Sequence, residues 1–108
     1  MIYTTEELAA RIIPVVRRYG IKAVWIFGSY ARGNASEDSD VDILIDTDGS
    51  TLTGLFSLGI LYSELEEVLG KAIDLITLNA LQQETHMKSE DSFRKTVWKE
   101  KVSLYDAA

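Results

Sequence analysis

Two short apolar runs joined by a small polar loop constrain this chain more than any other feature. The first run, residues 24–27, stops abruptly at Gly28-Ser29, and the second, residues 43–45, follows the tetrapeptide Ser39-Asp40-Val41-Asp42. Apolar runs of this length bounded by Gly, Ser and Asn are typical of buried strands. The sequence therefore predicts two neighbouring strands, each with polar groups at one end.

Two carboxylates stand together where the second predicted strand begins. Successive side chains of a strand alternate between its faces, so Asp40 and Asp42 are expected to project from the same side. Carboxylates held side by side repel each other unless a cation lies between them, and oxygen ligands suit a hard ion such as Mg2+ that also binds substrate phosphates. Asp46 lies about 13 Å further along the strand, too far to join this site, and we interpret it as a strand-end or loop residue.

The polar end of the first predicted strand suits a phosphate group. Gly28 lets the backbone approach a ligand closely, and Ser29 offers a hydroxyl donor. A helical turn beginning at Tyr30 would direct free N–H groups at an anion. Arg32 adds a fork of donors that suits a phosphate or a carboxylate of the neighbouring loop.

The ordered combination of these motifs resembles the signature of the polymerase-beta-like nucleotidyltransferase superfamily. Its form, GSYARG followed by SDVDILID, is most similar to the minimal nucleotidyltransferases (MNT), many of which are encoded beside a small helical HEPN partner. A lone Gly-Ser or a lone Asp-x-Asp would carry no such information. An ordinary turn and a pair of solvated carboxylates would also leave unexplained why Asp42 interrupts an apolar segment.

The resemblance implies a fold and a further site residue. The implied fold is α/β (α+β), a palm-like core in which helices pack on a small mixed β-sheet, and we expect residues 1–108 to form it as one domain. A third acid is implied on the strand after the Asp-x-Asp strand, where Asp74 is the only Asp or Glu in the apolar run 71–78. The alternative for Asp74 is an edge-strand acid that points into water.

The resemblance also implies a two-metal transfer of AMP from ATP, with two Mg2+ ions. By this analogy Gly28 and Ser29 bind the β- and γ-phosphates, Ser39 orients the Asp-x-Asp turn, and Arg32 steadies the loop or a phosphate. The predicted catalytic and metal-binding residues are Asp40, Asp42 and Asp74, and the predicted nucleotide-binding residues are Gly28, Ser29, Arg32 and Ser39.

The identity of the acceptor is the least determined part of this prediction. A chain of 108 residues has little room for a large acceptor pocket beside a nucleotide, so we expect another protein to present the acceptor hydroxyl. The resemblance implies a HEPN toxin that is neutralised by AMPylation. Two alternatives stay open, an antitoxin that acts by contact alone and transfer to a small molecule. The sequence also leaves open a homo-oligomer.

Composition narrows the surroundings in which the chain works. A formal net charge of −6 argues against direct, salt-driven binding to DNA. The sequence contains no run of about 18 apolar residues, so we expect no membrane span. The acidic N-terminus does not resemble a signal peptide. Cysteine is absent, which excludes disulfides and thiolate metal sites. A cytoplasmic protein is the default expectation.

The rest of the chain shows alternating helix and strand patterns. A capping-box pattern at Thr4 and Glu7 predicts a helix from near Thr5, in which Pro14 is expected to cause a bend or interrupt a hydrogen bond and Gly20 suits the end. Strands are predicted at 22–27, 40–46 and 71–78, and a helix at 53–69.

The last third of the chain is predicted to be helical. Asn79 is the expected cap of its first helix, and a second is predicted at 92–104. Phe93, Val97 and Trp98 fall at helical spacing there, more typical of a core or a dimer interface than of a base-stacking platform. His86 lacks metal or triad partners beside it, which predicts a surface position.

Overall fold

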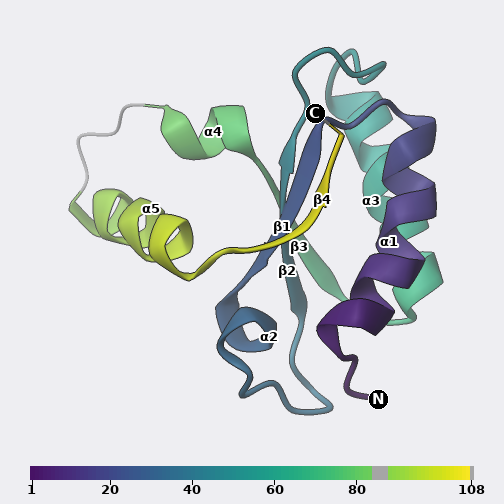
Figure 1. The fold of residues 1–108 in the computed structure, drawn as a ribbon. Coiled ribbons are helices and arrows are strands. Elements are labelled where there is room, and N and C mark those ends of the chain that lie inside the picture. The colour runs from purple at the N-terminus through teal and green to yellow at the C-terminus, as the bar shows by residue number, and fades with distance from the viewer. Residues whose placement is uncertain (84–87, 108) are drawn as a thin grey trace.

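The computed structural model describes residues 1–83 and 88–107, with side chains described up to residue 83 and from residue 92 onward. Helices and strands alternate through most of this range (Figure 1). The helices are α1 (Thr5–Arg18), α2 (Gly28–Arg32), α3 (Leu55–Leu69), α4 (Leu78–Gln82) and α5 (Lys88–Glu100), and the strands are β1 (Ala23–Phe27), β2 (Val41–Asp46), β3 (Ile73–Thr77) and β4 (Val102–Asp106).

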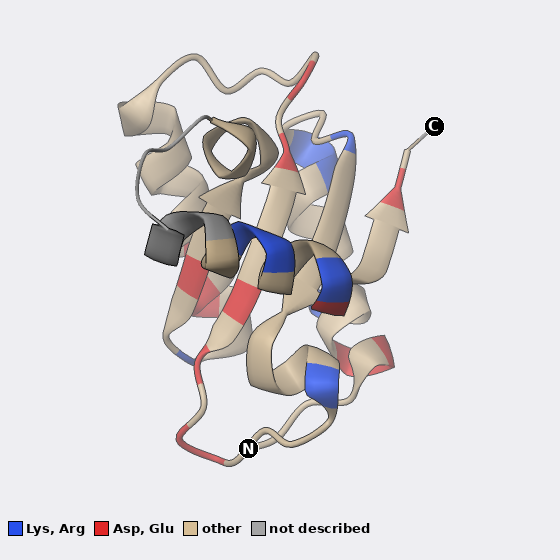
Figure 2. Cartoon of the chain, turned by 90° about the vertical axis from the view of Figure 1, so that its left-hand side faces the viewer, with Lys and Arg blue, Asp and Glu red and all other residues tan. Residues whose placement is uncertain are grey.

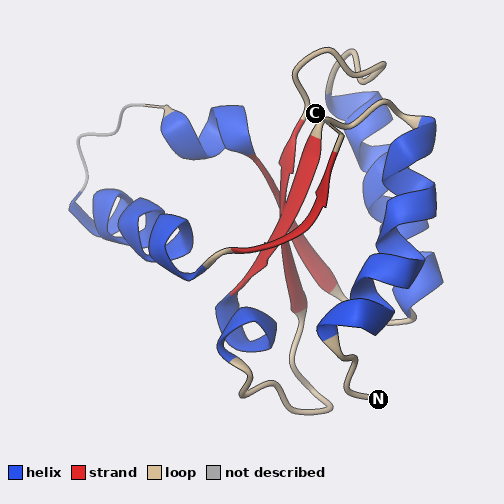
Figure 3. Cartoon of the chain, in the orientation of Figure 1, coloured by secondary structure: helices blue, strands red, loops and turns tan. Residues whose placement is uncertain are grey.

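The four strands form one mixed sheet in the order β3-β2-β1-β4. β1 pairs antiparallel with both β2 and β4, whereas β2 and β3 run parallel. Helices α1 and α3 cover one face of the sheet, and α4 and α5 lie on the other side (Figures 1 and 3). This arrangement confirms the predicted α+β class with helices packed on a small mixed sheet.

The core is divided unequally between the two faces of the sheet. On the α1–α3 face, Ile26 and Ile43 of the sheet and Leu61 and Leu65 of α3 are fully buried. The opposite face holds a smaller cluster, whose buried members are Phe27, Leu44, Leu81 and Val97. Because strand side chains alternate, β1 and β2 supply apolar residues to both clusters at once.

Helix α1 begins where the capping box predicts. The Thr4 hydroxyl accepts a hydrogen bond from the Glu7 backbone N–H at 3.1 Å, and the Glu7 carboxylate accepts one from the Thr4 N–H at 2.9 Å. The helix continues through Pro14 to Arg18. Gly20 follows in the left-handed conformation, with φ of 68°, as expected for the residue that ends a helix.

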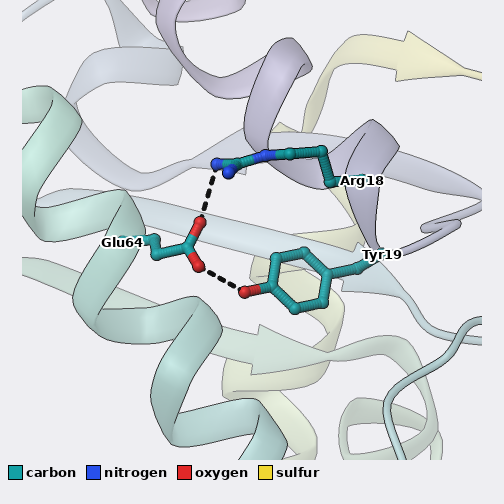
Figure 4. Close-up of polar contacts among 3 residues, drawn as sticks. All are labelled: Arg18, Tyr19 and Glu64. Carbon is teal, nitrogen blue, oxygen red and sulfur yellow. Dashed lines mark hydrogen bonds and ion pairs between the residues drawn. The ribbon is translucent and has the colours of Figure 1, made fainter.

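A polar contact ties the end of α1 to α3 (Figure 4). Glu64 accepts hydrogen bonds from the Tyr19 hydroxyl at 2.5 Å and from the Arg18 guanidinium at 2.7 Å. The bond to Glu64 is the main cause of a raised pKa at Tyr19, to which burial adds. The two helices are thus joined by a charge-assisted contact at one end and by apolar packing along their length.

The structure corrects the prediction for the end of the chain. The helix predicted at 92–104 ends at Glu100, and residues 102–106 form β4, which pairs with β1. Val102 and Leu104 both pack against the larger core cluster, and a spacing of two residues places them on one side of a strand. Strand pairing therefore overrides the apparent helical continuation.

Smaller differences concern where elements begin. Thr77, not Asn79, caps α4, because its hydroxyl accepts from the Ala80 N–H at 3.1 Å. β2 begins at Val41 rather than Asp40, because Ser39 is held in a turn with Ser36. The prediction for His86 lies outside the described residues.

No helix among the described residues is long and apolar enough to span a lipid bilayer.

Candidate active site

Strand pairing brings two of the predicted acids together. Asp42 of β2 lies opposite Phe27 of the antiparallel β1 and opposite Asp74 of the parallel β3. Directly paired residues project from the same face of a sheet. Asp42 and Asp74 therefore stand side by side on the face that also carries α4 and α5, where Leu44 packs two residues further along β2.

The electrostatics of Asp42 reflect this crowding. Burial, a hydrogen bond to Asp74, and repulsion from the Asp74 and Asp40 carboxylates raise the pKa of Asp42 to about 6, and the Arg32 charge opposes them. The ionised form of Asp42 is therefore disfavoured when no cation is near. A carboxylate pair with this property is a typical ligand set for a hard metal ion.

Asp40 occupies a different position from the other two acids. It precedes β2, is exposed, and influences Asp42 through its charge. Within the described parts of the chain, no three His, Cys, Asp or Glu side chains converge closely enough to form a preformed metal site. The structure thus supplies a pair, Asp42 and Asp74, with Asp40 on the turn that leads into it.

The Gly-Ser motif abuts the acid pair directly. β1 passes into α2 at Gly28, whose φ of 69° is in the left-handed region. A Cβ atom at this position would overlap the Asp42 carboxylate, with Cγ only 3.1 Å away. Glycine is therefore required both by the backbone conformation and by the approach of Asp42. Ser29 follows at the start of α2.

Two other predicted residues have partners within the protein. Arg32 donates to the Glu100 carboxylate of α5 at 3.0 Å, so its acidic partner comes from a distant helix and not from the neighbouring loop. The Ser39 hydroxyl accepts from the Ser36 backbone N–H at 2.8 Å. This bond shapes the turn that precedes Asp40.

A hollow of about 360 Å³ opens beside the acid pair. Its lining consists of Phe27, Asp42, Asp74, Leu75, Ile76 and Phe93. Phe93 of α5 meets Phe27 edge to face, with ring centroids 6.1 Å apart, and is 48% exposed. Figure 2 shows this side of the molecule, with acidic segments on adjacent strands next to the basic residues of α5.

Phe93 lines the hollow, a position that the sequence did not indicate. We predicted a core or interface position for it, but it lines the hollow beside Asp42 and Asp74. Its helical spacing with Val97 gives no indication of this role. The role depends on α5 folding over the end of β1, which local patterns do not encode.

The model of the nucleotidyltransferase domain family matches residues 10–104 of the chain. The chain belongs to this family. The resemblance that the two motifs indicated is therefore confirmed.

Curated relatives of this nucleotidyltransferase are named as protein adenylyltransferases. A Methanocaldococcus jannaschii protein with that name on a provisional basis is 45% identical over 77 residues, which is 70% of this chain and 80% of the relative. Protein adenylyltransferase MntA of Thermococcus cleftensis is 42% identical over 65 residues, 60% of this chain and 64% of its own length.

Solved structures share the fold of this nucleotidyltransferase. A provisionally named minimal nucleotidyltransferase superimposes with a TM-score of 0.64 at 30% identity, covering 93% of this chain and 95% of the other. A chain of a toxin–antitoxin complex with AMP-PNP gives a TM-score of 0.68 at 20% identity, covering 92% and 73%. A chain of a complex of tri-AMPylated Shewanella oneidensis HEPN toxin with MNT antitoxin gives a TM-score of 0.65 at 17% identity. The match covers 96% of this chain and 74% of the other. At these identities, the last two comparisons show that the fold is shared.

Proposed function

We propose that this nucleotidyltransferase moves AMP from ATP to a hydroxyl side chain of a HEPN-type toxin and so acts as an antitoxin. The paired carboxylates of Asp42 and Asp74, placed against the Gly28 turn and an open hollow, carry this proposal. The names of the relatives support protein adenylylation, and an MNT antitoxin with an AMPylated HEPN toxin supports the class of partner.

The donor set fits Mg2+. Asp42 and Asp74 present adjacent oxygen ligands, and burial together with the neighbouring Asp74 and Asp40 carboxylates raises the pKa of Asp42. We propose that these two residues, with Asp40 from the preceding turn, hold two Mg2+ ions. When bound, such ions stabilise the charge of the reacting phosphate and lower the pKa of an acceptor hydroxyl.

We base the remaining proposed roles on the family resemblance and on where each group lies. Gly28 and Ser29, at the start of α2, bind the β- and γ-phosphates of ATP. The acceptor oxygen forms a bond to the α-phosphorus, and the bond from that phosphorus to the bridging oxygen breaks, which releases pyrophosphate. Asp74, exposed on the edge strand, orients the acceptor hydroxyl and receives its proton.

Arg32 and Ser39 support the site without contacting the reacting atoms. Arg32 is engaged by Glu100, so we propose that it steadies α2 against α5. Ser39 holds the turn before Asp40 through Ser36. We expect a cytoplasmic location, where ATP is available, and no direct binding of DNA.

The reaction type can be tested with the position of a radioactive label. The protein is co-expressed with a HEPN-type partner and supplied with Mg2+ and ATP labelled at either the α- or the γ-phosphate. We expect label on the partner only from α-labelled ATP. Label from γ-labelled ATP would indicate phosphorylation and contradict the proposal.

The same experiment separates the two alternatives. A stable complex without label would favour an antitoxin that acts by contact alone. Absence of both complex and label would favour transfer to a small molecule, which a screen of hydroxyl-bearing compounds with α-labelled ATP would then detect.

A further inference from the structure

The Lys71 ammonium group connects three separate segments of the chain. It donates hydrogen bonds to the Tyr30 hydroxyl at 2.9 Å, to the Glu37 carbonyl at 3.0 Å and to the Met1 carbonyl at 3.1 Å. The ammonium also lies 5.3 Å from the centroid of the Tyr30 ring. An ammonium group has three N–H donors, so these contacts use its full donor capacity.

Two of the segments that Lys71 contacts carry residues of the proposed site, and so does the segment that holds Lys71 itself. Tyr30 belongs to α2 and follows Ser29 directly, and its side chain is only 7% exposed. Glu37 belongs to the turn that leads to Asp40. Lys71 itself lies two residues before β3, the strand that holds Asp74.

We infer that Lys71 is a positioning residue, whose ammonium fixes the Gly28-Ser29 turn, the turn before Asp40 and β3 relative to one another. This inference rests on the proposed function. α2 contributes phosphate ligands and the turn before Asp40 contributes a carboxylate, so their separation determines whether one ATP molecule can reach both. Displacement of reacting groups by about 1 Å costs up to roughly 100-fold in rate.

Substitution of Lys71 by methionine tests the inference most directly. Lys71→Met keeps an unbranched apolar side chain that can still contact the Tyr30 ring, and it removes all three donors. We expect kcat/KM for ATP to fall about 10- to 100-fold through both a higher KM for ATP and a lower kcat, with the KM for the acceptor unchanged. Lys71→Arg is expected to restore part of the loss, because a guanidinium retains donors toward Tyr30 and Glu37.

Arg11 provides a matched control elsewhere in the protein. It donates to the Val68 carbonyl at 3.2 Å, and its guanidinium lies 5.1 Å from the centroid of the Tyr3 ring. These contacts are of the same kind as those of Lys71, but neither partner belongs to α2 or to the turn before Asp40. Arg11→Met is therefore expected to change stability without changing the KM for ATP.

Tyr30→Phe completes a double-mutant cycle. Tyr30→Phe removes one acceptor of Lys71, so its effect on kcat/KM is expected to be small once Lys71→Met is present. Full additivity of the two changes would show that the Lys71–Tyr30 contact has no part in activity. Equal losses of kcat/KM for ATP in Lys71→Met and Arg11→Met would show a general effect on the fold. Either result would overturn the inference.

Amide hydrogen exchange tests the positioning role without any activity. In Lys71→Met, we expect amides of residues 34–40 to exchange at least several-fold faster than in the wild type, whereas Arg11→Met leaves them unchanged. Unchanged exchange in Lys71→Met would refute the role of Lys71. An inactive wild type with the expected exchange pattern would refute only the proposed function.

Discussion

Asp42 is the residue at which stability and function are expected to oppose each other. Its pKa of about 6 lies above the ordinary value of 3.8, so the folded protein binds a proton there more tightly than the unfolded chain. Linkage then requires the contribution of Asp42 to stability to be greatest below about pH 4 and to be lost as the pH rises through about 6.

Asp42→Asn should therefore stabilise the metal-free protein at neutral pH. The asparagine amide can donate to Asp74 without adding a charge. We expect the variant to have a higher free energy of unfolding than the wild type in EDTA at pH 7.5, and the difference to shrink toward pH 4. Urea denaturation at both pH values measures this.

Asp46→Asn is the control for that comparison. Asp46 lies on the same strand and accepts from the Asp48 N–H at 3.0 Å, away from Asp74. Substitution of Asp46 should not reproduce the pH-dependent increase in the free energy of unfolding. Mg2+ should raise the melting temperature of the wild type and of Asp46→Asn but not of Asp42→Asn. A destabilised Asp42→Asn protein at pH 7.5 would contradict this account of the acid pair.

Gly28 offers a second test at the scale of one residue. Gly28 and Gly33 both have positive φ, 69° and 80°, but an added Cβ would meet Asp42 at Gly28 and nothing within 4 Å at Gly33. Gly33→Ala should cost about 1–2 kcal/mol of backbone strain. Gly28→Ala should lower the free energy of unfolding, measured by urea denaturation, by more than Gly33→Ala does. It should also abolish transfer. Equal losses of stability would show that the Asp42 overlap is relieved without cost.

At the scale of elements, the two sides of the sheet differ in how firmly they are packed. Residues of α1 and α3 such as Leu8, Ile12 and Leu65 are fully buried, whereas the only buried side chain in the described part of α5, residues 92–100, is Val97. The salt bridge from Arg32 to α5 is partly exposed, and ion pairs near the surface contribute about 0–1 kcal/mol.

Helix α5 should consequently open before the rest of the fold. We expect its amides to exchange faster than those of α1 and α3 under native conditions, because local opening of α5 exposes less apolar surface. Hydrogen exchange followed by mass spectrometry or NMR measures this. Uniform protection across all three helices would contradict it.

Elements that local patterns define were predicted well, and those that depend on distant partners were not. The capping box at Thr4 located the start of α1, and apolar runs bounded by small residues located β1, β2 and β3. β4 was missed because Val102 also fits a continued helix, and only pairing with β1 makes it a strand.

The same distinction applies to the site. The family resemblance implied that Asp74 joins the Asp-x-Asp pair, and strand pairing shows Asp42 and Asp74 side by side. Other contacts of the site join residues that lie far apart in the chain. They are the contact of Phe93 with Phe27, the Arg32–Glu100 pair and the hydrogen bonds of Lys71. No short-range spacing predicts such contacts.

At the scale of the whole molecule, the proposed site and the larger core occupy opposite faces of one sheet. The acid pair, the hollow and α5 lie on one side, and the packing of α1 and α3 lies on the other. Polar substitutions in the site should therefore change chemistry without unfolding the protein. Because of this separation, one measurement on folded variants can test the role of the acid pair in transfer.

That measurement is the transfer of α-labelled AMP to a co-expressed HEPN-type partner by the wild type, Asp42→Asn and Asp46→Asn. Circular dichroism and co-purification establish that all three are folded and bind the partner equally. We predict label on the partner with the wild type and with Asp46→Asn, and at least a 100-fold reduction with Asp42→Asn, because the substitution removes a carboxylate that we propose to hold the ions that stabilise the reacting phosphate. Undiminished labelling by Asp42→Asn would contradict the assignment of the active site.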